Sequence, residues 1–202
     1  GGRLLQRHCA AHRYPLPGSA LSAGRPIAST IGRPGGGKST VGRQLARRLG
    51  LQFVDVDHAI EKRIACSIAE FFEREGEARF RDVESEVLLE LVDRVDHVIA
   101  TGGGIVLRES NRRLLNDRTV SIYLRSNPDE LFRRVRRDSR RPLLQVADPL
   151  TRLREMSAKR DPLYRQTAHY TIETGRPSVS TLVNMILMQL ELAGFVDPST
   201  VP

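Results

Sequence analysis

The chain has 202 residues, of which 40% are hydrophobic and 28% charged, and its net charge is +8 at neutral pH. This length fits one well-packed domain rather than two, and no apolar run approaches the roughly 20 residues of a membrane-spanning helix, so we expect no membrane partner. The only two cysteines, Cys9 and Cys66, argue against a disulfide framework or a zinc site and favour a cytoplasmic location.

Residues 1–25 are rich in Arg, Ala, Gly and Ser, and the first acidic residue is Asp55. We expect this extension to be disordered. Its composition is similar to that of a transit peptide, but it shows no convincing amphipathic arginine face, so an over-extended start or a cloning remnant is the preferred interpretation. Residues 26–194 are then expected to form the single domain. The tail, residues 195–202, has no periodicity and is expected to fray.

Short apolar runs alternate with amphipathic stretches from residue 26 onward. The runs that read as strands are Pro26–Ile31, Phe53–Val56, His97–Thr101, Val120–Leu124 and Tyr170–Thr174. A strand followed by a helix, five times, predicts an α/β fold with a five-stranded parallel sheet flanked by helices on both faces. The first strand, PIASTI, is less apolar than a buried central strand usually is.

Several helix ends carry recognisable signals. Ser67 and Glu70 have the spacing of a capping box, Gly76 is a plausible helix stop, and Asn127-Pro128 should open another helix. The last helix shows an apolar stripe that we interpret as core, formed by Leu182, Met185, Ile186 and Leu190.

The stretch IGRPGGGKST, residues 31–40, fits the pattern G-x-x-x-x-G-K-[ST] between a predicted strand and a predicted helix, Lys38–Leu49. Glycines allow backbone N–H groups to surround an anion, and the following helix adds its positive N-terminal end. Lys38, one of only three lysines, would reach the β- and γ-phosphates, and the Ser39 hydroxyl would bind Mg²⁺. The plain alternative is a flexible surface turn.

A pair of carboxylates follows in FVDVD. Because strand side chains alternate, Asp55 and Asp57 should point to the same side, at the carboxyl end of the sheet beside the phosphate loop. One acid would then serve magnesium and the other an acceptor hydroxyl; alternatively, both are solvated acids that cap the next helix. The third strand ends in HVIATGGG with no acid, unlike motors and helicases with a Walker B aspartate.

An ordered set of motifs extends over residues 27–193. After the phosphate loop come FVDVDHAIE, GEARFRDVE, ATGGG, RRDSRRPLL, RDPLYRQTA and TGRPS. In this order the chain resembles the shikimate kinase family, a nucleoside-monophosphate-kinase-like group of P-loop proteins. The resemblance implies a three-layer P-loop kinase sandwich with a mobile lid at about residues 138–148. It also implies ATP-dependent phosphorylation of the 3-hydroxyl of shikimate, with Mg²⁺, by an enzyme that is expected to be a monomer.

The same resemblance assigns roles to particular residues. The catalytic residues would be Lys38, Asp57 and Arg141. Nucleotide binding is implied for Gly35, Gly36, Gly37, Lys38, Ser39, Thr40, Arg134, Arg141 and Pro177. Shikimate binding is implied for Asp57, Arg81, Gly102, Gly103, Gly104 and Arg165. The metal would be held by Ser39 and Asp55. Glu84, one helical turn beyond Arg81, is expected to orient that arginine.

Some features depart from the family or favour other classes. Arg33 and Gly36 stand where the family more often has a hydrophobic residue and an Ala or Ser. Among the arginines between residues 125 and 141, we interpret Arg133, Arg136, Arg137 and Arg140 as a solvated helix face. A P-loop kinase for gluconate or a nucleoside monophosphate would lack Arg81, Arg165 and the three glycines as a set. A nucleic-acid-binding NTPase would explain the charge of +8, but with 5% aromatic residues we expect no nucleic-acid partner.

Overall fold

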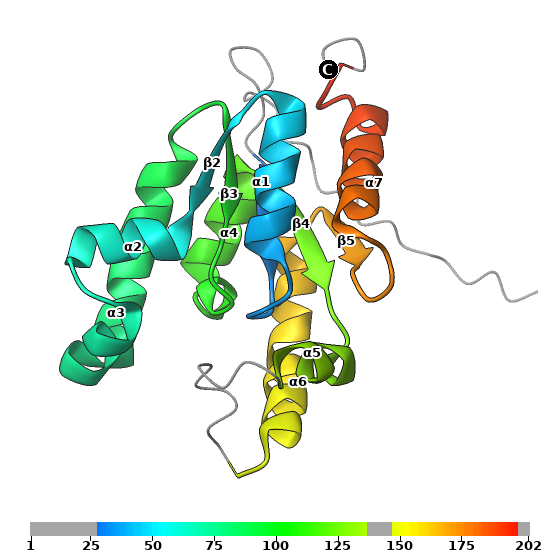
Figure 1. The fold of residues 1–202 in the computed structure, drawn as a ribbon. Coiled ribbons are helices and arrows are strands. Elements are labelled where there is room, and N and C mark those ends of the chain that lie inside the picture. Colours follow the sequence, from blue (N-terminus) through cyan, green and yellow to red (C-terminus); the bar gives the residue numbers. More distant parts are fainter. Residues whose placement is uncertain (1–27, 137–146, 198–202) are drawn as a thin grey trace, which may run out of the picture.

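The computed structural model describes residues 28–136 and 147–197. Its strands form one parallel sheet in the order β2-β3-β1-β4-β5 (Figure 1). The strands are β1 (Ala28–Gly32), β2 (Gln52–Asp55), β3 (His97–Ala100), β4 (Val120–Arg125) and β5 (Tyr170–Glu173). The parallel five-stranded sheet predicted from the sequence is confirmed, and the strand bounds differ from the predicted ones by one or two residues.

Helices connect the strands and cover both faces of the sheet (Figure 1). They are α1 (Lys38–Leu49), α2 (Val56–Ile64), α3 (Ile68–Val92), the short 3₁₀ helix η2 (Ile105–Leu107), α4 (Glu109–Arg118), α5 (Pro128–Val135), α6 (Pro149–Thr167) and α7 (Val179–Leu192). One hydrophobic core lies between the sheet and the pair α1 and α7, around Leu45, Val98 and Ile186. The other lies between the sheet and α2, α3, η2, α4 and α6, around Leu88 and Ile99.

The polar composition of β1 is explained by a buried network of hydroxyl groups. β1 is the central strand, and all five of its residues are buried. The Ser29 hydroxyl lies 2.7 Å from that of Thr119 and 2.9 Å from that of Ser121, and the Thr30 hydroxyl donates to the backbone oxygen of Lys38 at 3.2 Å. Because each hydroxyl has a partner, the strand can be polar and still lie in the middle of the sheet.

The predicted helix signals are present in the structure. Ser67 and Glu70 form both hydrogen bonds of a capping box at the start of α3, and Asn127 caps α5 ahead of Pro128. Gly76, with φ of 80° and ψ of 170°, interrupts α3 and divides it into two helical parts. The stop predicted at Gly76 is therefore a bend rather than an end.

Two predictions about the end of the chain are wrong in part. Phe195, placed by the sequence in the fraying tail, is buried against the core of α1 and α7, and its N–H donates to the oxygen of Leu190. Met185, expected in the core, is 38% exposed. The extension of residues 1–25 and most of the predicted lid lie outside the described residues.

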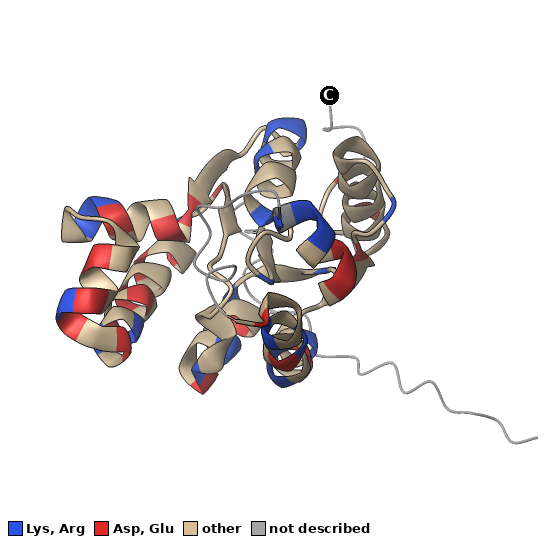
Figure 2. Ribbon diagram, turned by 60° about the horizontal axis from the view of Figure 1, so that its bottom comes forward, with Lys and Arg blue, Asp and Glu red and all other residues tan. Residues whose placement is uncertain are grey.

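Charged residues of both signs are interspersed on α2 and α3, as Figure 2 shows. The net charge of +8 is therefore not gathered on that part of the molecule. Within the described ranges, no helix combines the length and the apolar character that crossing a membrane requires.

Candidate active site

The phosphate loop joins the end of β1 to the first residue of α1. Gly35 and Gly37 have positive φ angles of 75° and 83°, which turn the backbone into the loop without the clash that a side chain would cause. Lys38, the first residue of α1, is buried, and its Nζ donates to the backbone oxygen of Arg33 at 2.7 Å. The helix N-terminus, the loop amides and this amine together make a site for phosphate groups.

The two predicted aspartates lie beside the loop, although not both on a strand. β2 ends at Asp55, and Asp57 lies in the first turn of α2, so the argument from strand alternation is wrong for this pair. Asp55 accepts from the Ser39 hydroxyl at 2.5 Å and also caps α2 by accepting from the N–H of His58 at 3.3 Å. The cap interpretation is therefore confirmed for Asp55, and its role beside magnesium stays a prediction.

One pocket brings most of the predicted site residues together. Its volume is about 450 Å³, and it lies where the carboxyl ends of β1, β2 and β3 meet. It is lined by Pro34, Gly35, Gly37, Lys38, Ser39, Thr40, Asp55, Asp57, Thr101, Gly102 and Gly103. The lining thus combines the phosphate loop with Asp57 and with the glycines that follow β3.

The glycines at 102–104 are explained by close approach of their neighbours. A Cβ on Gly102 would lie 2.7 Å from the Asp57 carboxylate, and one on Gly103 would lie 2.6 Å from the ring of Pro34. A Cβ on Gly104 would overlap the guanidinium of Arg81. The three glycines therefore leave room for Asp57, Pro34 and Arg81, and their contact with shikimate stays a prediction.

Arg81 is held in a fixed orientation beside these glycines. Its side chain is 13% exposed, and it donates to Glu84 at 2.7 Å and to Glu77 at 3.3 Å. The predicted role of Glu84 as the residue that orients Arg81 agrees with this contact. Because Glu84 is almost fully buried, movement of the guanidinium away from it would leave a buried carboxylate without this partner, which is costly.

Both acidic groups on the acceptor side have raised pKa values. Burial is the main cause of the raised pKa of Asp57, and the charge of Asp55 adds to it, while Lys38 and Arg81 oppose the shift. Burial likewise raises the pKa of Glu84 against the opposing effect of Arg81. A half-buried carboxylate with a raised pKa in a pocket is suited to accept a proton.

Arg165 does not lie with the other predicted acceptor residues. It is half exposed, and its Nε donates to Asp161 at 2.7 Å. A different arginine on the same helix, Arg160, acts electrostatically on both Glu84 and Tyr164. Tyr164 in turn donates to the backbone oxygen of Gly103 at 2.5 Å, so the Arg160 face of α6 points toward the pocket.

Sequence reasoning missed Arg160, although a signal was present. Residues four apart on a helix share a face, whereas residues five apart differ by about 140°. The buried Tyr164 of RDPLYR is four residues after Arg160 and next to Arg165. A helical reading of α6 therefore favours Arg160 as the inward-facing arginine.

The residues predicted around the adenine lie outside the 450 Å³ pocket but close to each other in the fold. Arg134, near the end of α5, donates to the backbone oxygens of Thr174 and Gly175 at 3.2 and 3.4 Å. Pro177 is half buried in the same loop, between β5 and α7. Arg141 lies outside the described residues.

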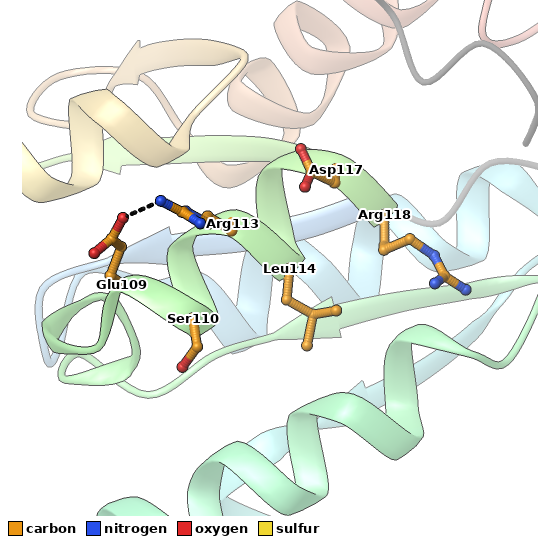
Figure 3. Close-up of a pocket in the computed structure, with 6 residues that line it drawn as sticks. All are labelled: Glu109, Ser110, Arg113, Leu114, Asp117 and Arg118. Carbon is orange, nitrogen blue, oxygen red and sulfur yellow. Dashed lines mark hydrogen bonds and ion pairs between the residues drawn. The ribbon is translucent and has the colours of Figure 1, made fainter.

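A different hollow, on the outer side of α4, does not belong to this site (Figure 3). Its volume is about 540 Å³, and its six lining residues all come from one helix, where Glu109 and Arg113 form an ion pair at 2.5 Å. The phosphate-loop pocket, in contrast, is lined by residues of several elements, among them the phosphate loop and both aspartates, which supports it as the candidate active site.

Comparison with known proteins shows which family the chain is similar to. The family model described as shikimate kinase matches residues 34–191. The chain is 58% identical to the shikimate kinase of Paracidovorax citrulli, over 84% of this chain and 94% of that protein. It is 55% identical to the shikimate kinase of Burkholderia pseudomallei strain 1710b, over 82% of this chain and 90% of that protein.

Solved structures agree as well. The fold superposes with a TM-score of 0.79 on the structure of shikimate kinase from Acinetobacter baumannii in complex with shikimate. The two sequences are 44% identical, and the match covers 86% of this chain and 96% of that one. Because the family model matches residues 34–191 and the relatives are more than 50% identical over four fifths of the chain, the chain belongs to the shikimate kinase family.

Proposed function

We propose that this protein transfers the γ-phosphoryl group of ATP to the 3-hydroxyl of shikimate, giving shikimate 3-phosphate and ADP in the biosynthesis of aromatic amino acids. One observation carries the proposal. A single 450 Å³ pocket is lined both by the phosphate loop and by Asp57, whose pKa is raised, together with glycines whose neighbour Gly104 lies against the oriented Arg81. Phosphoryl transfer needs this arrangement because catalysis rests on positioning and charge stabilisation.

At the donor end, the loop amides and Lys38 would bind the β- and γ-phosphates, with Gly35, Gly36, Gly37 and Thr40 shaping the loop. The Ser39 hydroxyl, which donates to the Asp55 carboxylate at 2.5 Å, would bind Mg²⁺, and Asp55 would help to hold the ion through water. Magnesium neutralises charge on the phosphate oxygens when bound. Arg134 and Pro177 would flank the adenine, and Arg141 would approach the transferring phosphate.

At the acceptor end, Asp57 would bind the ring hydroxyls and accept the proton of the attacking one. Arg81, fixed by Glu84, would bind the carboxylate of shikimate through two parallel hydrogen bonds. Gly102, Gly103 and Gly104 would let the backbone approach the ring. For the second arginine, the contacts of α6 favour Arg160 over Arg165.

The test is an ADP-release assay on an acceptor panel of shikimate, an analogue without the carboxylate, gluconate and nucleoside monophosphates. Wild type should be active on shikimate and weak on the rest. Arg81→Lys should bind ATP normally but hold shikimate loosely, because lysine replaces a planar fork with one point charge. Equal activity on the carboxylate-free analogue, or preference for gluconate or a nucleotide, would contradict the assignment of the acceptor.

We also propose that the enzyme acts as a cytoplasmic monomer without a nucleic-acid or membrane partner. The support is that residues of this one chain line the pocket on both the donor and the acceptor side. Light scattering at assay concentration should give the mass of one chain. Activity that falls on dilution, or salt-dependent binding to DNA or RNA, would contradict the proposal.

A further inference from the structure

We propose that buried Arg33 and half-buried Asp161 form a link that positions the phosphate loop against helix α6, so that Asp161 controls nucleotide affinity without touching the nucleotide. The proposal rests on the nucleotide-binding role given to the loop above. Arg33 and Asp161 are positioning residues, because they act through the backbone that holds Lys38.

Arg33 extends from the phosphate loop into the protein rather than into solvent. Its side chain is 4% exposed, it donates to the backbone oxygen of Ser126 at the end of β4, and its Nη2 lies 3.9 Å from Oδ1 of Asp161. Its Nε is buried without a hydrogen-bond partner among the described residues. A buried guanidinium is costly unless a counter-charge offsets its desolvation, so Asp161 determines whether this orientation is stable.

The backbone of Arg33 is part of the active site. Its oxygen accepts from Nζ of Lys38 at 2.7 Å and from the N–H of Gly36 at 3.1 Å. Gly36 packs so tightly that a Cβ there would lie 3.1 Å from this same oxygen and 3.3 Å from the Ser126 hydroxyl. Movement of the Arg33 side chain would therefore shift the carbonyl that holds the lysine and the loop amides beside it.

Asp161 is well fixed at the other end of the link. Its carboxylate accepts from the Tyr123 hydroxyl at 2.7 Å, from Arg165 at 2.7 Å and from Arg125 at 3.4 Å. Burial alone would raise the pKa of Asp161, but the bonds from Arg165 and Tyr123 outweigh it and lower the pKa. The group is therefore a stable anion at neutral pH, as a partner for buried Arg33 must be.

The link also lies on the helix that contacts the glycines after β3. Asp161 stands between Arg160 and Tyr164 on α6, and Tyr164 donates to Gly103 on the acceptor side. Arg33 lies close enough for its charge to act on both Tyr123 and Tyr164, whose rings stack with centroids 4.9 Å apart. One helix thus contacts the donor loop through Asp161 and the acceptor loop through Tyr164.

The test measures ADP binding by titration calorimetry for wild type, Arg33→Leu, Asp161→Asn and the double variant, with a melting curve for each. Each single variant should weaken ADP binding by about fivefold or more, and the double variant should be no weaker than the singles, because contacting residues act non-additively. A purely structural role would lower the melting temperature and leave the ADP affinity of the folded protein unchanged. Additive effects, or wild-type affinity in Asp161→Asn, would overturn the proposal.

The matched control is Arg125→Met. It also removes an arginine that contacts Asp161, but Arg125 is 39% exposed and lies outside the phosphate loop. Its ADP affinity should stay within about twofold of wild type, and a loss as large as that of Arg33→Leu would overturn the link. If Arg33→Leu does not fold, Asp161→Asn against this control decides the question. Failure of wild type itself to bind ADP would contradict the proposed function instead.

Discussion

At the scale of single residues, the amine of Lys38 is the group on which phosphoryl transfer depends most directly. It is buried at the start of α1 and its position is set by the loop backbone. Lys38→Met should lower kcat by roughly 10²-fold or more, because the positive charge that stabilises the transition state is lost. Turnover and thermal melting should be measured together, since a melting temperature near that of wild type separates lost chemistry from lost folding. Unchanged turnover would contradict the role of the loop.

The raised pKa of Asp57 predicts a pH dependence. If Asp57 accepts the proton, it must be ionised, so kcat/KM for shikimate should fall with decreasing pH around a midpoint above the ordinary 3.8 of an aspartate. A profile of kcat/KM against pH checks this. An acid limb at or below that value would show that Asp57 is not the base.

The raised pKa of Asp57 also affects folding stability, which should decrease with rising pH where the activity increases. Because the folded state holds the Asp57 proton more tightly than the unfolded state, the contribution to stability is full below 3.8 and is lost as pH rises through the raised pKa. Denaturation of Asp57→Asn should therefore lack this part of the pH dependence. Catalysis thus requires the ionised form of Asp57, whereas folding stability favours its protonated form.

At the scale of elements, helix α6 presents two arginines to different surroundings. Arg160 shares a face with buried Tyr164, whereas Arg165 is half exposed and bound to Asp161. Arg160→Ala should raise the KM for shikimate by about tenfold or more, as expected for loss of a charged hydrogen bond to a carboxylate, and Arg165→Ala should change it far less. Steady-state kinetics on both variants decide between them; a larger effect at Arg165 would restore the residue first predicted.

The break in α3 makes a further prediction. Gly76 has a backbone conformation that is essentially limited to glycine, and no atom lies within 4 Å of where a Cβ would stand, so Gly76→Ala introduces only backbone strain. It should reduce the free energy of unfolding by about 1–3 kcal/mol. Arg81 lies in the part of α3 that follows this bend, so a strained bend should displace Arg81 and lower the affinity for shikimate.

The control for Gly76 is Gly194→Ala. Gly194 also has a positive φ, of 75°, and open space around it, but it lies at the end of α7. This variant should lose stability without losing shikimate affinity, as checked by urea unfolding and a shikimate titration. Equal losses of affinity in both would show that strain alone, and not the bend, affects the site.

Elements with local signals could be predicted from the sequence, and those decided by packing could not. Helix α1 begins at Lys38 and ends at Leu49 as predicted, because the glycine loop and Gly50 mark its ends. The central position of the polar β1 could not be predicted, because its hydroxyl partners Thr119 and Ser121 are about 90 residues away. The alternation of FVDVD predicts Asp55 and Asp57 on one side of a strand, although the Asp55 cap starts a helix there.

At the scale of the whole molecule, closure of the lid over the pocket remains a prediction. Arg141, outside the described residues, should supply charge to the transferring phosphate, so Arg141→Ala should lower kcat by roughly 10²-fold or more with little change in shikimate binding. Arg140→Ala is the matched control and should do little. Single-turnover kinetics together with a shikimate titration test this prediction. A larger effect of Arg140→Ala than of Arg141→Ala would show that Arg141 is not the arginine that contacts the phosphate.

The donor half of the site could be predicted more fully than the acceptor half. The phosphate loop is one continuous segment, so Lys38 and Ser39 were identified from spacing alone. The acceptor side joins Asp57 on α2, Arg81 on α3, Gly103 after β3 and Tyr164 on α6, and only folding reveals which faces meet. The link from Arg33 to Asp161 spans 128 positions and has no local signal in the sequence.

The hydroxyl-lined central strand also has a consequence for biosynthesis of the chain. β1 leaves the ribosome first among the strands, yet its partner β3 begins to pair with it about 70 residues later, at Ala28 and Val98, and β4 later still. At about 5–20 residues per second, the nascent strand waits roughly 4–14 s with both edges open. A segment of Val and Ile would be prone to aggregate during that delay, whereas Ser29 and Thr30 keep it hydrated until translation supplies its neighbours.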